Sequence, residues 1–189
     1  SLVPSEHGRR PEVLTSFSWA ALLHGRLSEA TPALEEAWKL ATRRELPVIK
    51  ARVLYMRAVI DFTYNDHLAG REKAEEALGL LTGCDEPDDL AWTQLVLCLC
   101  HWRAGEIEEA DALIRRSLQR FDQVEDMTAS FLAYSTYQKI AHARGDWRRV
   151  LSYDKSETAP TSSYIITALY FTGRIEEGDA YLQSLISGI

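Results

Sequence analysis

Three cysteines and a nearby histidine are the side chains in this sequence best suited to bind a metal ion. Cys98 and His101 are three residues apart, so on a helix both point to one side, and Cys84 is a conceivable third ligand. Structural zinc usually shows two paired ligand spacings, and no second pair is present. We therefore expect two core thiols and a histidine that faces a turn, and neither a metal ion nor a cofactor.

Pairs of glutamates are the other arrangement that suits chemistry, because neighbouring carboxylates can act as a general acid and base. They recur at the same place after successive apolar stretches, and catalytic carboxylates need burial that exposed runs lack. The sequence also has no GxSxG, GxxxxGK or GxGxxG motif, so we expect no enzyme and no catalytic residue. Solvated helix faces or ends are the expected places for these pairs and for three arginine pairs: Glu35-Glu36, Glu75-Glu76, Glu108-Glu109, Glu176-Glu177, Arg43-Arg44, Arg115-Arg116 and Arg148-Arg149.

Five glycines divide the chain into the elements that must position these side chains. Each glycine closes one apolar stretch and opens another, and their separations are 45, 35, 40 and 28 residues. A glycine suits the tight turn after a helix because it reaches left-handed backbone angles without a Cβ clash. The sequence therefore predicts five helix pairs, each folded about one glycine: Gly25, Gly70, Gly105, Gly145 and Gly173.

The residues around Gly105 show the helical pattern most clearly. After it, apolar residues recur at spacings of three and four, and the opposite face carries acids first and bases last. Before it, the stretch 90–103 is apolar nearly all round, which predicts a helix packed between neighbours. No stretch has the alternation and turns of a strand. We expect an all-helical fold with helices at about 12–24, 27–44, 48–66, 71–82, 88–104, 107–122, 127–144, 147–156, 162–172 and 175–187.

These helix pairs resemble tetratricopeptide repeats, which carry small and bulky apolar residues at fixed offsets around a turn glycine. The match is clearest in WTQLVLCLCHWRAGEIEEADALIRRSL, and the first repeat is similar. The second repeat is ambiguous by one position at Ala74, and the fourth and fifth depart from the pattern at Val150 and Gly178. The resemblance covers most of residues 11–187. It implies one domain, a right-handed α-solenoid of about five antiparallel helix pairs, and it says little about function.

The irregular repeat length is similar to that of the sensor domains of large bacterial ATP-dependent transcription regulators of the LuxR class, such as the maltose regulator. This resemblance implies a regulatory or sensor segment, with the 189 residues being a fragment of a longer chain. The alternative is a stand-alone scaffold that joins two proteins. Flanking regions that bind a nucleotide and form a helix-turn-helix would support the sensor, and their absence would support the scaffold.

The first helix of each pair would line the concave face of such a solenoid. Positions three and four apart before each glycine predict a groove that is aromatic with a few cations, which suits a protein, peptide or small molecule that is partly apolar and partly anionic. Packing in the core is the commoner role for any single aromatic. Since Asn65 is the only asparagine, a carboxylate clamp is disfavoured. The expected partner-binding residues are Trp19, Arg57, Tyr64, His67, Trp92, Trp102, Arg103, Lys139 and Tyr170.

Composition limits the partners further. The net charge of -7 repels a phosphate backbone, so we expect no direct nucleic-acid binding. No window reaches the roughly 18 apolar residues of a membrane span, so no membrane partner is expected. Three cysteines without a disulfide pattern favour a reducing cytoplasm.

The last predicted helix carries an apolar strip that no later polar helix covers. A solenoid needs a polar outer face at each end. We therefore expect this strip to be covered by further chain or, in a homodimer, by the C-terminal helix of a second copy. Its residues are Tyr181, Leu182, Leu185, Ile186 and Ile189.

Overall fold

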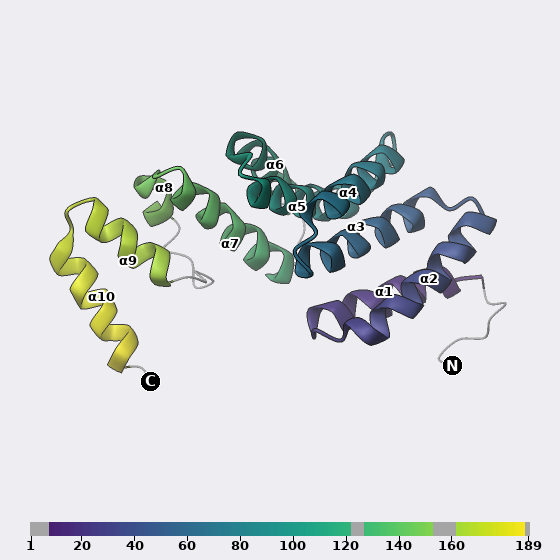
Figure 1. Ribbon diagram of the computed structural model, residues 1–189, viewed down its shortest axis with the longest axis horizontal. Helices are drawn as coiled ribbons and strands as arrows, with labels where there is room; N and C mark the ends of the chain where they lie inside the picture. Colours follow the sequence, from purple (N-terminus) through teal and green to yellow (C-terminus); the bar gives the residue numbers. More distant parts are fainter. Residues whose placement is uncertain (1–7, 122–126, 153–161, 188–189) are drawn as a thin grey trace. The chain divides into compact units, whose positions relative to one another are not determined.

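The computed structural model describes residues 8–121, 127–152 and 162–187, and within these ranges it contains ten helices and no strand (Figure 1). The predicted all-helical fold is confirmed for this part of the chain. Nine of the ten connections and helix ends lie close to their predicted positions, and the connection between the third and fourth helices does not. The helices are α1 (Arg10–Leu23), α2 (Leu27–Arg43), α3 (Pro47–Thr63), α4 (His67–Leu81), α5 (Pro87–Ala104), α6 (Ile107–Phe121), α7 (Met127–Ala143), α8 (Trp147–Ser152), α9 (Ser162–Phe171) and α10 (Ile175–Ser187).

Local sequence explains where several of these helices begin. Pro47 and Pro87 occupy the first positions of α3 and α5, where a helix needs no backbone N–H. Asp66 caps α4 by accepting a hydrogen bond from the Ala69 backbone N–H at 3.1 Å. Acidic residues stand in the first turns of α5, α6 and α10, where the helix dipole favours them.

The chain forms two compact units, which we call unit 1 (Ser1–Gly105) and unit 2 (Glu106–Ile189). In unit 1, each helix packs against the next, and α1 also contacts α3 while α3 contacts α5. In unit 2, neighbouring helices again pack in sequence, and α7 also contacts α9. The first helices of the pairs therefore form a layer of their own in unit 1, made of α1, α3 and α5.

The turn after α3 corrects one of the five predicted turn glycines. Gly70 lies inside α4 and is buried, whereas the left-handed residue of this turn is Asn65, with a φ of 67°. Asparagine tolerates this conformation better than most side chains. The third helix consequently ends at Thr63 rather than at residue 66, and the fourth begins at His67 rather than at residue 71.

This correction also changes the repeat length. The left-handed residues of the first four pairs, Gly25, Asn65, Gly105 and Gly145, are each 40 residues apart, and only the last step, to Gly173, is 28 residues. The irregular spacing predicted for the first three pairs was therefore wrong. In the corrected register, Gly70 stands at the small-residue position that Ala30 and Ala110 occupy, and the ambiguity at Ala74 disappears.

Close approach of the helices explains the glycine at this position. A Cβ on Gly70 would lie 3.1 Å from the backbone oxygen of Ala58 on α3 and 3.2 Å from Sγ of Cys100 on α5. Burial raises the pKa of this Cys100 thiol to about 11, so the thiol is protonated at neutral pH. Every residue from 91 to 98 is also buried, which confirms that α5 is packed on nearly all sides.

Candidate functional site

An aromatic cluster joins the three first helices of unit 1. The rings of Trp19 on α1 and Trp92 on α5 meet edge to face with centroids 4.5 Å apart, and the ring of Tyr55 on α3 lies 6.2 Å from Trp19. Tyr55 and Trp92 are buried, while Trp19 is half-buried. The structure thus brings together two of the predicted partner-binding residues, and it leaves part of Trp19 accessible.

A buried ion pair lies beside this cluster. The Asp89 carboxylate, only 4% exposed, accepts hydrogen bonds at 2.9 Å from Nε of Arg52, and Nη2 of the same guanidinium is 2.8 Å from Oδ2. The Tyr55 hydroxyl donates a longer bond to Asp89 at 3.4 Å. The hydrogen bond with Asp89 raises the pKa of Arg52, and burial raises that of Tyr55. This network holds Arg52 charged and in one orientation.

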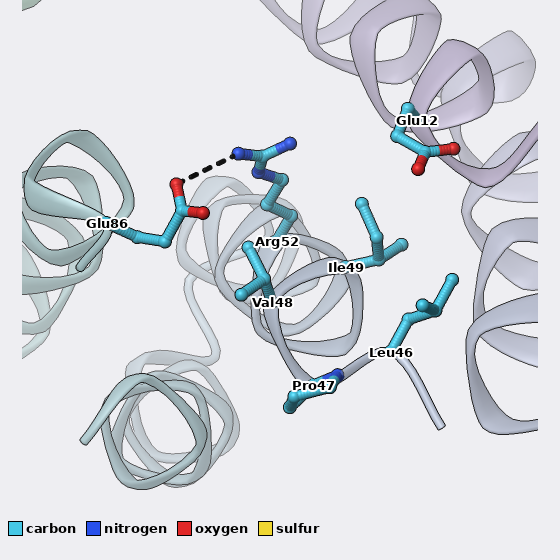
Figure 2. A pocket seen from close by; sticks show the side chains of 7 residues that line it. All are labelled: Glu12, Leu46, Pro47, Val48, Ile49, Arg52 and Glu86. Atoms are coloured by element: carbon cyan, nitrogen blue, oxygen red, sulfur yellow. Dashed lines mark ion pairs between the residues drawn. The ribbon is translucent and has the colours of Figure 1, made fainter. Parts of the chain in front are cut away.

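A cavity of about 270 Å³ opens next to Arg52, near the first turns of α1, α3 and α5. Figure 2 shows the Arg52 side chain between the carboxylates of Glu86 on one side and Glu12 on the other, above the apolar start of α3. Nη2 of Arg52 lies 3.6 Å from Oε2 of Glu86. The lining residues are Glu12, Leu46, Pro47, Val48, Ile49, Arg52 and Glu86, and we call this cavity the α1/α3/α5 pocket.

One carboxylate oxygen in this pocket lacks a donor. Oε2 of Glu12 is buried, and no described residue donates a hydrogen bond to it. A buried acceptor without a partner costs about 1–3 kcal/mol. The α1/α3/α5 pocket therefore contains a group that is available to a ligand and that gains from binding one.

Sequence reasoning missed Glu12, Arg52, Glu86 and Asp89. Glu12 and Arg52 are 40 residues apart and so occupy equivalent positions in successive first helices, with opposite charges. This relation was hidden because Gly70 was taken as the turn residue. Glu86 and Asp89 are three residues apart at the start of α5, a spacing that places both on one side of a helix.

The predicted residue Arg57 does not face this pocket. Its guanidinium lies 5.4 Å from the ring of Trp38 on α2, and Nζ of Lys50 lies 5.1 Å from the same ring. Since Lys50 and Arg57 are about two helical turns apart, they share one side of α3. That side is the one packed toward α2, away from Arg52.

Four other predicted residues lie at the opposite ends of these helices. Tyr64 follows the last residue of α3 and is 70% exposed, and His67 opens α4 with a buried Nδ1 that has no partner among the described residues. Arg103 donates to Oδ1 of Asn65, and Trp102 beside it is half-buried. The guanidinium of Arg103 also lies 5.6 Å from the ring of Phe62. These residues form a second exposed group at the α3–α4 turn.

The remaining predicted residues belong to unit 2. Lys139 is half-buried on α7. Tyr170, at 39% exposure, donates from its hydroxyl to Oδ1 of Asp179 at 2.7 Å, and its ring packs where a Cβ on Gly178 would stand. Stacking of Trp147 on Phe171, with centroids 4.7 Å apart, extends this aromatic region.

An arginine cluster in unit 2 corrects another expectation. Asp111 on α6 accepts hydrogen bonds from Arg115 at 3.1 Å, from Arg144 at 3.3 Å and from Arg149. Arg149 is only 9% exposed, and its guanidinium lies 3.6 Å above the ring of Tyr137. The prediction that the pair Arg148-Arg149 is a solvated helix end was therefore wrong for Arg149, because a buried aspartate on another helix neutralises it.

The exposed strip expected on the last helix is present in part. Leu182 and Ile186 on α10 are 36% and 58% exposed, while Tyr181 and Leu185 are half-buried. Ile189 lies outside the described residues. The predicted homodimer through this helix stays a prediction.

Comparison with known proteins identifies no relative: the sequence matches no protein-family model and no curated protein. Within the described ranges, no three His, Cys, Asp or Glu side chains are grouped so that they could hold a metal ion. Cys98, Cys100 and His101 are all buried, as expected for core side chains. In the same part of the chain, no helix has the length and apolar character needed to cross a membrane.

Proposed function

We propose that this chain is a non-enzymatic binding module, a right-handed α-solenoid of about five tetratricopeptide-like helix pairs, and that it binds its partner on the α1, α3 and α5 layer. The observation that carries the proposal is the α1/α3/α5 pocket, where a buried oxygen of Glu12 has no donor. The 40-residue spacing of the turns and the separate layer of first helices support the solenoid.

The residues of the pocket suit recognition rather than catalysis. Asp89 and Arg52 neutralise each other and hold each other in place, so neither is poised to transfer a proton. No serine, threonine or cysteine lines the pocket to act as a nucleophile. The pocket instead offers fixed charges above an apolar surface, which are the features that orient and select a ligand.

We further propose that the module is the regulatory or sensor segment of a bacterial transcription regulator in the cytoplasm. The regular 40-residue spacing removes irregular repeat length as an argument for this setting. What supports it now is a small preformed pocket, which suits sensing of one chemical group, whereas a scaffold joins its partners over larger surfaces. The three cysteines, none in a disulfide, fit a reducing compartment. A gene that also encodes a nucleotide-binding region and a helix-turn-helix would favour the regulator over the scaffold.

The test begins with selection of binders from a random peptide library and a panel of small molecules, followed by fluorescence anisotropy. Trp19→Ala should weaken binding by about tenfold, because half-buried aromatics at a site often carry binding energy of this size. Trp38→Ala is the matched control, since Trp38 is also half-buried in unit 1 but faces Lys50 and Arg57. Equal losses in the two variants, both with native circular dichroism, would place the binding site elsewhere.

A further inference from the structure

We propose that the α1/α3/α5 pocket receives an organic cation, namely an ammonium group on an unbranched apolar stem. Such a group is supplied by a lysine side chain of a partner or by a free alkylamine. This inference rests on the proposed binding function and specifies its chemistry. It reverses the expectation from sequence that the partner is partly anionic, which was based on the residues around Arg103.

The charges around the pocket favour a cation. Glu12, Glu86 and Asp89 contribute three carboxylates, and Arg52 contributes one guanidinium, so two negative charges are left over. The starts of α3 and α5 add partial positive charges of roughly half an elementary charge each, which is less than this excess. An anion would have to approach Glu12 and Glu86 directly, which costs free energy, whereas a cation is attracted to both.

The positions of the two glutamates also suit an ammonium group. Oε2 of Glu12 is buried without a donor, and Glu86 reaches Arg52 only at 3.6 Å. An ammonium group has three N–H donors and can satisfy several carboxylate oxygens at once. Hydrogen bonds between ionised groups are about twice as strong as neutral ones.

The size and floor of the pocket suit a narrow apolar stem. A volume of about 270 Å³ lies just below the range of about 300–1,000 Å³ that drug-sized ligands occupy, so the pocket fits one side chain or a small amine. Leu46, Val48 and Ile49 provide the apolar contact that methylene groups need. Lysine places its charge at the end of such a stem, and n-butylammonium reproduces it as a free molecule.

The experiment titrates the full chain, labelled with ¹⁵N, with n-butylammonium chloride at constant ionic strength and follows the amide resonances of unit 1. We expect shifts at the first turns of α1, α3 and α5. Butan-1-ol, which has the same stem without the charge, should bind at least about tenfold more weakly, because it lacks the charge-assisted hydrogen bonds. Equal binding of the alcohol and the ammonium ion would overturn the proposal.

Variants then test the role of Glu12. Glu12→Gln should weaken n-butylammonium binding about tenfold, and Glu35→Gln, an exposed glutamate on α2, should leave it unchanged. Glu86→Gln provides a second test, with a smaller loss expected because Glu86 is already paired with Arg52. Unchanged affinity in both pocket variants, or equal losses in the Glu35 control, would refute the assignment.

The source of the cation is decided with the peptides selected for binding to the chain. If a partner lysine fills the pocket, replacing that lysine by norleucine should weaken binding about tenfold to the wild type and have little effect on Glu12→Gln. If n-butylammonium binds and no lysine matters, the ligand is a free amine. If peptides bind in a Trp19-dependent manner while n-butylammonium causes no shift at the pocket and norleucine is tolerated, the cation inference fails and the proposed function stands.

Discussion

Two buried aspartates, Asp89 in unit 1 and Asp111 in unit 2, neutralise arginines that come from other elements. Asp89 receives a bidentate contact from Arg52 alone, while Asp111 receives hydrogen bonds from three arginines. In both cases a single charge would be expensive to bury, and the paired groups make burial possible. The two differ in accessibility, because Arg52 borders a cavity and Arg149 is covered.

Removal of the Asp111 charge should therefore destabilise the protein. We expect Asp111→Asn to lower the free energy of unfolding by about 3 kcal/mol, since Arg149 would remain buried without a counter-charge. Glu109→Gln is the control, because Glu109 is exposed on the same helix and should change the value by less than about 0.5 kcal/mol. Urea denaturation followed by circular dichroism measures both, and similar values for the two variants would show that Asp111 is not structural.

The same residue should also affect the pH dependence of stability. Burial opposes ionisation of Asp111, but hydrogen bonds from Arg149 and Arg115 outweigh it and lower the pKa of the carboxyl. A lowered folded-state pKa stabilises the fold above the unfolded pKa of about 4, and this contribution is lost as the pH falls through the folded pKa. Below about pH 4, the melting temperature of the wild type should thus fall more steeply than that of Asp111→Asn. Parallel curves would contradict this account.

At the scale of elements, apolar spacing predicted the helices well, and one turn escaped it. Spacings of three and four persist through each helix because one side must be buried, so the number and type of elements can be read from them. The end of α3 depends instead on a single left-handed residue. Glycine is the usual choice, and here Asn65 takes the place of glycine while Asp66 caps the next helix. The adjacent Asn and Asp were the available signal.

The error at this turn explains why the pocket was not predicted. With Gly70 as the turn residue, the second repeat is displaced, and Arg52 no longer matches Glu12 in the first helix. Trp19 and Trp92 were nevertheless chosen from local spacing, and the structure brings their rings together. Spacing within one helix is thus readable from sequence, whereas a site formed by three helices requires the correct register between them.

The role of Gly70 as a packing residue gives a prediction at this scale. Alanine in a helix is favoured over glycine by about 1 kcal/mol, so Gly79→Ala, at an exposed position of α4 with open space around it, should stabilise the protein by about that much or less. Gly70→Ala should instead destabilise it by about 1 kcal/mol, because crowding against Ala58 and Cys100 outweighs the helix preference. Thermal unfolding of both variants measures the contrast. A gain in stability for Gly70→Ala would show that α3, α4 and α5 can separate without loss.

At the scale of the whole molecule, charge decides which macromolecules the chain can approach. The sequence has 28 acidic and 21 basic residues, and the most concentrated arginines, those around Asp111, are partly neutralised by it. Nucleic-acid binding needs several lysines or arginines that can exchange counterions with phosphates. The same excess of negative charge is compatible with a cationic partner for unit 1.

The chain should accordingly show no binding to DNA, even at low salt, where electrostatic attraction is strongest. Fluorescence anisotropy of a short labelled duplex should remain unchanged up to about 100 µM protein, the weak end of ordinary non-specific affinity. A variant that changes four exposed glutamates to lysine would raise the net charge from -7 to +1 and serves as the control, because it should bind the duplex weakly and lose that binding as salt increases. The four positions are Glu35, Glu76, Glu108 and Glu109. Binding by the wild type that weakens with salt would mean that a local basic surface outweighs the net charge, and it would exclude a purely cationic class of partner.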